Sequence, residues 1–250
     1  MRFQGALLES CVIKLLLLLV SGAKLGKLFA SGGTMLVSLV VYAFVFGWRY
    51  ATGFIALLFA HEMGHFMAAR QRGLAVGLPT FIPFVGAWID LKEQPRDVET
   101  EAYVALAGPV VGTVAAILCY IAAGDDGPRW LLAVAYAGFF LNLFNLMPLS
   151  PLDGGRITAV LSPRIWLVGV PLLIAFFLWH PNPILLLIAL LAAPQVLKAW
   201  RYDPKAPENA VYYAISPRRR AEILAVYFGL AAYLAFMAYR THELISPGAA

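Results

Sequence analysis

The chain has 250 residues, of which 61% are hydrophobic and only 13% are charged. Soluble domains carry roughly 45–50% apolar and about 25% charged residues, so this composition argues against a water-soluble globular domain. It excludes a disordered chain more firmly, because disordered chains are poor in apolar residues and rich in charge. The length accommodates several membrane helices of about 20 residues joined by short loops.

The net charge is +5, but the 19 Lys and Arg residues stand between apolar runs rather than in one basic patch. Basic residues in such positions are typical of membrane topology signals, and we therefore expect no nucleic-acid partner. The two cysteines, Cys11 and Cys119, lie far apart in apolar surroundings. Their spacing indicates neither a disulfide framework nor a cysteine-based metal site.

Residues 1–33 form a basic N-terminal segment. Its apolar run, residues 15–20, is followed by small residues as in a secretory signal, but Glu9 and Lys14 shorten the apolar core. We therefore favour a basic helix that lies in the membrane interface, with a cleaved signal as the alternative.

Seven apolar runs then predict an all-α polytopic membrane protein. They are, in chain order, Thr34–Trp48, Gly53–Ala69, Tyr103–Ala123, Trp130–Met147, Ile165–Trp179, Ile184–Trp200 and Ala221–Tyr239. Prolines crowd the fifth and sixth runs, which can therefore form a bent hairpin, and we expect six to seven transmembrane helices. With the N-terminus inside, 16 of the 19 basic residues fall on the inner side, which predicts this orientation by the positive-inside rule.

The second run contains the ionisable residues His61, Glu62 and His65. Such groups are costly in hydrocarbon and are retained mainly where they pair, line a cavity or bind a ligand. Histidines four residues apart lie on one helix face, about 40° apart in azimuth and roughly 6 Å apart along the axis. Both imidazoles can therefore reach one zinc ion, with Glu62 beside it as general base. The alternative is a pair of core histidines hydrogen-bonded to a carboxylate.

A catalytic zinc site takes three protein ligands and leaves a fourth position for water. His180 and His242 fall at the outer ends of predicted spans, whereas the histidine pair lies near the inner end of its span. Asp153 follows the fourth span on that same inner side, and the neighbouring prolines and glycines let the chain turn back into the protein. We therefore predict Asp153 as the third ligand. The alternative is that Asp153 N-caps a short helix.

Two motifs together resemble the site-2 protease family of intramembrane zinc metalloproteases. One is His61-Glu-Met-Gly-His65, and the other is Asn145-x-x-Pro148 followed by Leu152-Asp-Gly-Gly155. The resemblance covers about residues 53–156. It implies that His61, His65 and Asp153 hold one zinc ion, that Glu62 activates the water, and that Asn145 orients the substrate. The family element Ala107-Gly108-Pro109 is expected to be structural, because small residues let helices approach closely.

Residues 78–89 are apolar but broken by prolines and glycines. Irregular backbone at membrane depth is tolerated only where protein buries it or where it lines a cavity. The resemblance implies a membrane-dipping hairpin or loop whose edge pairs with extended substrate, and we assign Val85 and Gly86 to substrate binding on that basis. Ala87 stands where the family commonly has a second glycine. A simple interfacial loop is the alternative.

The resemblance thus implies peptide-bond hydrolysis in transmembrane-helix substrates near the cytoplasmic face of a prokaryotic cell membrane. The expected partners are a membrane-spanning protein substrate and the lipid bilayer. The predicted organisation is an N-terminal segment (1–33), an intramembrane metalloprotease domain (34–200, core 53–156), a cytoplasmic loop (201–220), and a C-terminal helix and tail (221–250). The alternatives are a membrane metal transporter, which predicts ionisable residues along several spans, and a non-catalytic relative that binds membrane helices.

Overall fold

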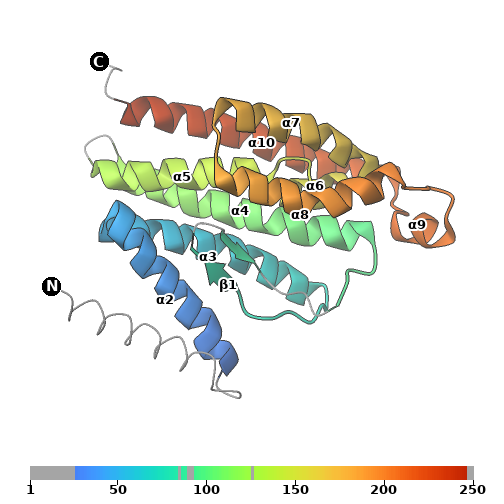
Figure 1. Cartoon of the computed structure of the whole chain (residues 1–250), viewed down its shortest axis with the longest axis horizontal. Helices are drawn as coiled ribbons and strands as arrows, with labels where there is room; N and C mark the ends of the chain where they lie inside the picture. Colours follow the sequence, from blue (N-terminus) through green and yellow to red (C-terminus); the bar gives the residue numbers. More distant parts are fainter. Residues whose placement is uncertain (1–25, 84–85, 89–92, 125–126, 247–250) are drawn as a thin grey trace.

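The computed structural model describes residues 26–83, 86–88, 93–124 and 127–246, and these residues form a bundle of helices with one small hairpin (Figure 1). The helices are α2 (Gly26–Phe46), α3 (Trp48–Gln71), α4 (Val98–Ala123), α5 (Arg129–Asn145), α6 (Asp153–Thr158), the 3-10 turn η1 (Pro163–Ile165), α7 (Trp166–Trp179), α8 (Pro183–Trp200), α9 (Pro207–Tyr212) and α10 (Pro217–Ile245). The strands are β1 (Thr80–Ile82) and β2 (Gly86–Trp88), which pair antiparallel.

Polar side chains cap the first turn of several of these helices. The Asp97 carboxylate accepts a hydrogen bond from the Thr100 N–H at 2.7 Å at the start of α4. Asn182 and Ser216 cap α8 and α10 in the same way. Proline occupies the first turn of both α8 and α10, where its missing N–H has no intrahelical partner to lose.

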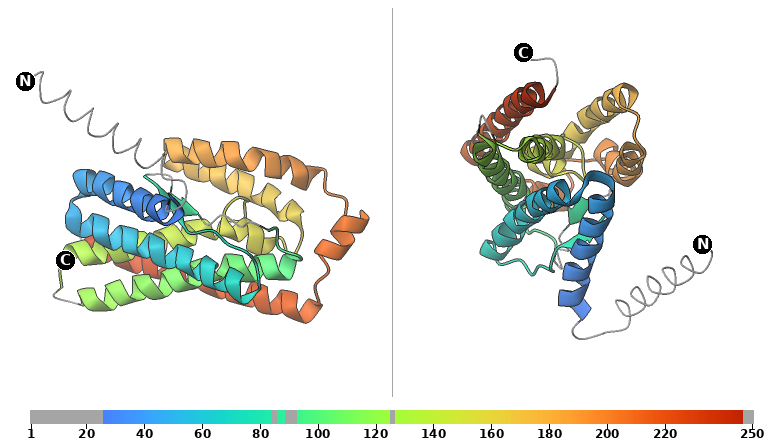
Figure 2. Two further views of the ribbon diagram at one scale, coloured as in Figure 1. Left: turned by 90° about the horizontal axis from the view of Figure 1, so that it is seen from below. Right: turned by 90° about the vertical axis from the view of Figure 1, so that its left-hand side faces the viewer.

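The bundle is organised around α4 and α5. Helix α3 packs on both of them from one side and α10 from another, while α2 crosses α3 obliquely. The view along the bundle shows α7 and α8 as a separate antiparallel pair beside the others (Figure 2), joined by three residues around Pro181. This pair is the hairpin that the prolines of the fifth and sixth runs allow.

Within the described residues, α4, α8 and α10 are long and apolar enough to cross a membrane, and residues 31–46 and 163–179 form shorter apolar helices. Large apolar side chains also face outward; the exposed fraction is 86% for Phe44, 74% for Leu178 and 76% for Trp200. Such an outer surface suits lipid rather than water. These features indicate a multi-pass membrane protein, and the number of six to seven spans stays a prediction.

Helices extend into two segments that the sequence analysis placed outside the membrane domain. Helix α2 begins at Gly26, so it reaches into the segment assigned to the N-terminal 33 residues, of which 1–25 lie outside the described residues together with Cys11. The segment 201–220 also contains α9 and the first turn of α10.

The described basic residues are distributed unequally between the two ends of the bundle. Helices α3, α5 and α8 end, and α4, α7 and α10 begin, at the end where α9 lies, on the right of Figure 1. At that end or in its loops are Arg70, Arg72, Arg96, Arg156, Arg164, Lys198, Arg201, Lys205, Arg218, Arg219 and Arg220; the opposite end has Arg49, Arg129 and Arg240. The metal-ligand candidates lie toward the basic end of their helices.

Glycine lets α5 approach both of its neighbours. A Cβ atom at Gly138 would come within 2.7 Å of the Leu57 side chain on α3 and 2.9 Å of the Ala116 methyl group on α4. The next residue, Phe139, is fully buried in the same core. The three-helix contact therefore depends on the absence of a side chain at this position.

We expect Gly138→Leu to lower the free energy of unfolding by about 1–3 kcal/mol, because overpacking forces neighbouring side chains and helices apart. Thermal unfolding of the detergent-purified protein measures this change. Gly229→Leu is the matched control, since nothing lies within 4 Å of a Cβ atom at Gly229 on α10. Equal melting temperatures for the two variants would contradict the packing argument.

Candidate metal centre

Helix α3 presents the two histidines of the motif from successive turns. His61 and His65 are both buried, and their Nε2 atoms face each other at 3.1 Å. The surrounding positions of the helix are apolar, including the buried Leu57 and Leu58 one turn earlier. His61 and His65 therefore lie on one helix face, as predicted, and that face is directed into the protein.

Asp153 joins the histidines from α6. Its Oδ2 atom lies 3.2 Å from His61 Nε2 and 3.3 Å from His65 Nε2. Asp153 is the first residue of α6, and the N-cap position belongs to Leu152, so the N-cap alternative is wrong. The turn is tight, because a side chain at Gly154 would overlap the Leu146 carbonyl and one at Gly155 would overlap the Ser150 main chain.

Hydrogen bonds on the far side of each ring indicate which nitrogen carries the proton. His65 Nδ1 lies 2.8 Å from the Val104 carbonyl oxygen, which can only accept, so Nδ1 donates. The Asn142 amide nitrogen donates to the Gly138 carbonyl at 2.7 Å, which leaves its Oδ1 to accept from His61 Nδ1 at 2.8 Å. In both imidazoles Nδ1 is engaged by a protein acceptor, and Nε2 is the nitrogen directed at the common point.

The Nε2 atoms of two imidazoles and a carboxylate oxygen thus converge on one point. A tetrahedral zinc site with bonds of about 2.0–2.1 Å requires donor atoms about 3.3 Å apart, and the three separations here are 3.1, 3.2 and 3.3 Å. The donor set of His61, His65 and Asp153 therefore suits a zinc ion.

Glu62 lies next to this donor set in the sequence and is also buried, with an exposed fraction of 5%. Its carboxylate makes no hydrogen bond or salt bridge to any residue that the structure describes. A buried carboxylate without a protein partner is available to a bound water molecule. That availability is what the role of general base requires.

Glycines shape the site where α3 meets α4. A side chain at Gly64 would overlap the Ala107 carbonyl group, and one at Gly108 would overlap the His65 ring. The Ala107-Gly108-Pro109 element therefore serves as the close-packing feature that we expected. A side chain at Gly112, one turn further along α4, would overlap the Asn142 amide.

The predicted substrate-binding residues are not all brought to the cluster. Asn145 is the last residue of α5, is half-buried, and has no hydrogen bond to the described part of the site. Gly86 is the first residue of β2, opposite Ile82, while Val85 lies outside the described residues. His180 and His242 lie at the other end of their helices, as expected.

The sequence reasoning missed Asn142 as the partner of His61. One signal was present, because an asparagine within an apolar membrane run is itself a functional candidate. Asn145, three residues later, matches the family motif and was assigned a role in its place. Only the contact across α3 and α5 distinguishes the two asparagines.

We expect Asn142→Ala to weaken zinc affinity about 10–100-fold, because partners that orient a ligand histidine typically contribute this much. Competition with a coloured chelator on the detergent-purified protein measures the affinity. Asn145→Ala is the control, and it should retain the affinity of the unaltered protein. If Asn142→Ala binds zinc as tightly as Asn145→Ala, Asn142 does not orient His61.

Comparisons with known proteins agree with the geometry. Residues 49–125 match the family described as Peptidase family M50. The chain is 32% identical over 111 residues to Rip3 of Mycobacterium tuberculosis, covering 41% of this chain and 28% of the relative. It is 30% identical over 110 residues to zinc metalloprotease MJ0392 of Methanocaldococcus jannaschii, covering 42% and 32%.

Among solved structures, a site-2 protease from Methanocaldococcus jannaschii aligns with a TM-score of 0.43 and 21% identity, covering 67% of this chain and 85% of that chain. The chain thus aligns with less than a third of the length of Rip3 and about a third of that of MJ0392. The matched segment nevertheless includes the complete His61-Glu-Met-Gly-His65 motif. Over this segment the chain is similar to Peptidase family M50 and to proteins named as zinc metalloproteases.

Proposed function

We propose that this chain is a zinc metalloendopeptidase that cleaves transmembrane-helix substrates near the cytoplasmic membrane face. The observation that carries the proposal is the convergence of two imidazole Nε2 atoms and one carboxylate oxygen, with separations of 3.1–3.3 Å, beside the unpartnered Glu62. The match of residues 49–125 to Peptidase family M50 and the names of the relatives support it. The cytoplasmic side is supported by the basic end of the bundle.

In this proposal His61, His65 and Asp153 hold one zinc ion. A bound zinc ion lowers the pKa of its water toward about 7 and polarises the scissile carbonyl group. Glu62 accepts the proton of the attacking water and returns it to the leaving amine. Asn142 and the Val104 carbonyl hold the two imidazoles in the required tautomers, and Asn145 orients the substrate main chain.

We further propose that an extended stretch of substrate pairs with the outer edge of β2. Ala87 lies opposite Phe81, whose N–H turns away from β2 to donate to Thr34 Oγ1 at 3.2 Å. Residues opposite each other are then a non-hydrogen-bonded pair, so the Ala87 N–H and C=O also point outward. Neither makes a main-chain hydrogen bond to the described residues outside the hairpin, which leaves them to a peptide strand.

A metal transporter is the alternative from a different class of function. It would require ionisable side chains along a path through several spans. Of the residues that the structure describes, the buried acidic and histidine side chains are His61, Glu62, His65 and Asp153, and no Lys or Arg is buried. All four belong to one cluster, which favours a single reaction site over a transit path.

The catalytic assignment predicts different results for two variants. Glu62→Gln should retain zinc and lose cleavage of a single-span substrate by about 100-fold or more, because it removes only the proton acceptor. Asp153→Ala should lose both zinc and cleavage, because it removes a ligand. Elemental analysis and gel-based cleavage of a panel of single-span substrates measure these properties. Undiminished cleavage by Glu62→Gln would falsify the assignment.

The strand-pairing proposal predicts a change in KM rather than in zinc content. Ala87→Pro removes one main-chain donor, and a hydrogen bond worth about 0.5–1.5 kcal/mol corresponds to a KM increase of roughly 2–13-fold. Ala87→Val retains the N–H and is the matched control. Steady-state cleavage with both variants gives the comparison, and identical KM values would rule out pairing through Ala87.

A further inference from the structure

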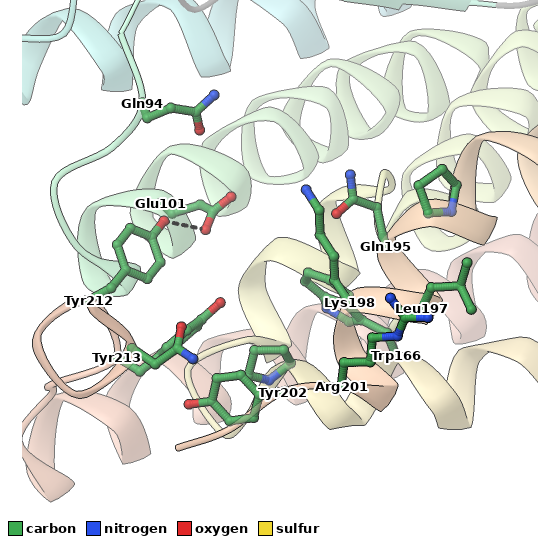
Figure 3. A pocket seen from close by; sticks show the side chains of 13 residues that line it. Gln94, Glu101, Trp166, Gln195, Leu197, Lys198, Arg201, Tyr202, Tyr212 and Tyr213 are labelled. Atoms are coloured by element: carbon green, nitrogen blue, oxygen red, sulfur yellow. Dashed lines mark hydrogen bonds between the residues drawn. The ribbon is translucent and has the colours of Figure 1, made fainter. Parts of the chain in front are cut away.

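A carboxylate on the first turn of α4 connects the metal centre to two other elements. Glu101 Oε1 accepts a hydrogen bond from Arg156 Nε on α6 at 3.3 Å, and Oε2 accepts one from the Tyr212 hydroxyl on α9 at 2.7 Å. Figure 3 shows Tyr212 and Glu101 directed at each other across the edge of a pocket. Both carboxylate oxygens are therefore occupied by partners far away in the sequence.

The ion pair between Glu101 and Arg156 joins α4 to α6, the helix that carries Asp153. Arg156 lies three residues after Asp153, within the six-residue α6. A helix this short is not stable by itself, because the cost of nucleation exceeds the gain from its few hydrogen bonds. Its position is therefore set by contacts with its neighbours, and Glu101 is the carboxylate that contacts Arg156 among the described residues.

The ion pair between Glu101 and Arg156 is partly buried, unlike an ordinary surface ion pair. The Arg156 and Glu101 side chains have exposed fractions of only 23% and 22%, and partly buried pairs are screened less than exposed ones. Trp166 adds a second polar contact to α6, since its Nε1 donates to the Gly155 carbonyl at 2.8 Å. Glu101 thus supplies the charged contact that holds α6 against α4.

Tyr212 aligns the same carboxylate from the other side. Burial and the neighbouring Glu101 raise the pKa of Tyr212 strongly, so its hydroxyl stays protonated and can donate. Helix α9 has no buried residue, and a pocket of about 670 Å³ separates it from α8, lined in part by Trp166, Lys198 and Tyr202. The Tyr212 ring packs against the edge of the hydrophobic core, and its hydroxyl group ties α9 to Glu101.

We infer that Glu101 is a positioning residue for the metal centre, acting through Arg156 on the placement of Asp153. This inference rests on the proposed function, because it concerns the same site. The side-chain partners of Glu101 among the described residues are Arg156 and Tyr212, and none of the three metal-ligand candidates is among them. Its loss should therefore change the affinity and geometry of the metal site and lower kcat, with little effect on KM.

The test compares Glu101→Ala, Arg156→Ala and the double variant in the purified full chain, with Glu99→Ala as matched control. Glu99 is on the same turn of α4 but pairs with Arg219 on α10, at 3.0 Å and away from α6. Zinc affinity is measured by chelator competition, and ligand geometry by the visible spectrum after cobalt substitution. Cleavage of a single-span substrate gives kcat and KM.

We expect Glu101→Ala to weaken zinc affinity about tenfold or more, to alter the cobalt spectrum, and to lower kcat at unchanged KM. Glu99→Ala should match the unaltered protein. The double variant should be no worse than Arg156→Ala, because a shared interaction is lost only once. Thermal unfolding of each variant identifies any that fail to fold, and Tyr212→Phe then provides a milder variant whose cobalt spectrum should also shift.

Two results would overturn the inference: wild-type zinc affinity and cobalt spectrum in folded Glu101→Ala, or strictly additive losses in the double variant. If Glu101→Ala does not fold, an unchanged cobalt spectrum in Tyr212→Phe would also overturn the inference. Failure of the proposed function is separable, because the unaltered protein would then neither retain zinc nor cleave substrate.

Discussion

The rest of the structure depends on one constraint, which is that three candidate metal-ligand atoms are held together inside an apolar helix bundle. His61, His65 and Asp153 are buried, and their donor atoms lie 3.1–3.3 Å apart. Buried polar atoms are unfavourable unless hydrogen bonds or a cation compensate them. The surrounding helices hold both imidazoles through hydrogen bonds on the far side of each ring, and α6 places Asp153 beside them.

Those supporting bonds come from elements that lie far apart in the chain. Val104 on α4 orients His65, and Asn142 on α5 orients His61. Gly64 and Gly108 let α3 and α4 approach until the imidazole ring lies against main chain. The packing of α3, α4 and α5 with the short α6 therefore forms the candidate metal centre. The exposed apolar surface of the bundle suits contact with lipid instead.

Composition and motif spacing were sufficient for the class of protein and for most of the donor set. Charged residues are so few that Glu62 and Asp153 stand out beside histidines at helical spacing, and the structure brings Asp153 to the pair as expected. All seven predicted apolar runs lie largely or wholly within helices. The number of membrane crossings stays a prediction, because length and hydropathy identify only α4, α8 and α10 among the described residues.

The sequence by itself determined which residues are candidates for a metal site, since periodicity places His61 and His65 on one face of one helix and needs no knowledge of the neighbours. Only the tertiary structure decided which partners complete them. The sequence motif singles out Asn145, whereas the crossing of α3 and α5 brings Asn142 to His61. Glu101 is one of several acidic residues near the start of α4, and the positions of Arg156 and Tyr212 give it a distinct contact. Such choices depend on distances between helices, which local spacing does not encode.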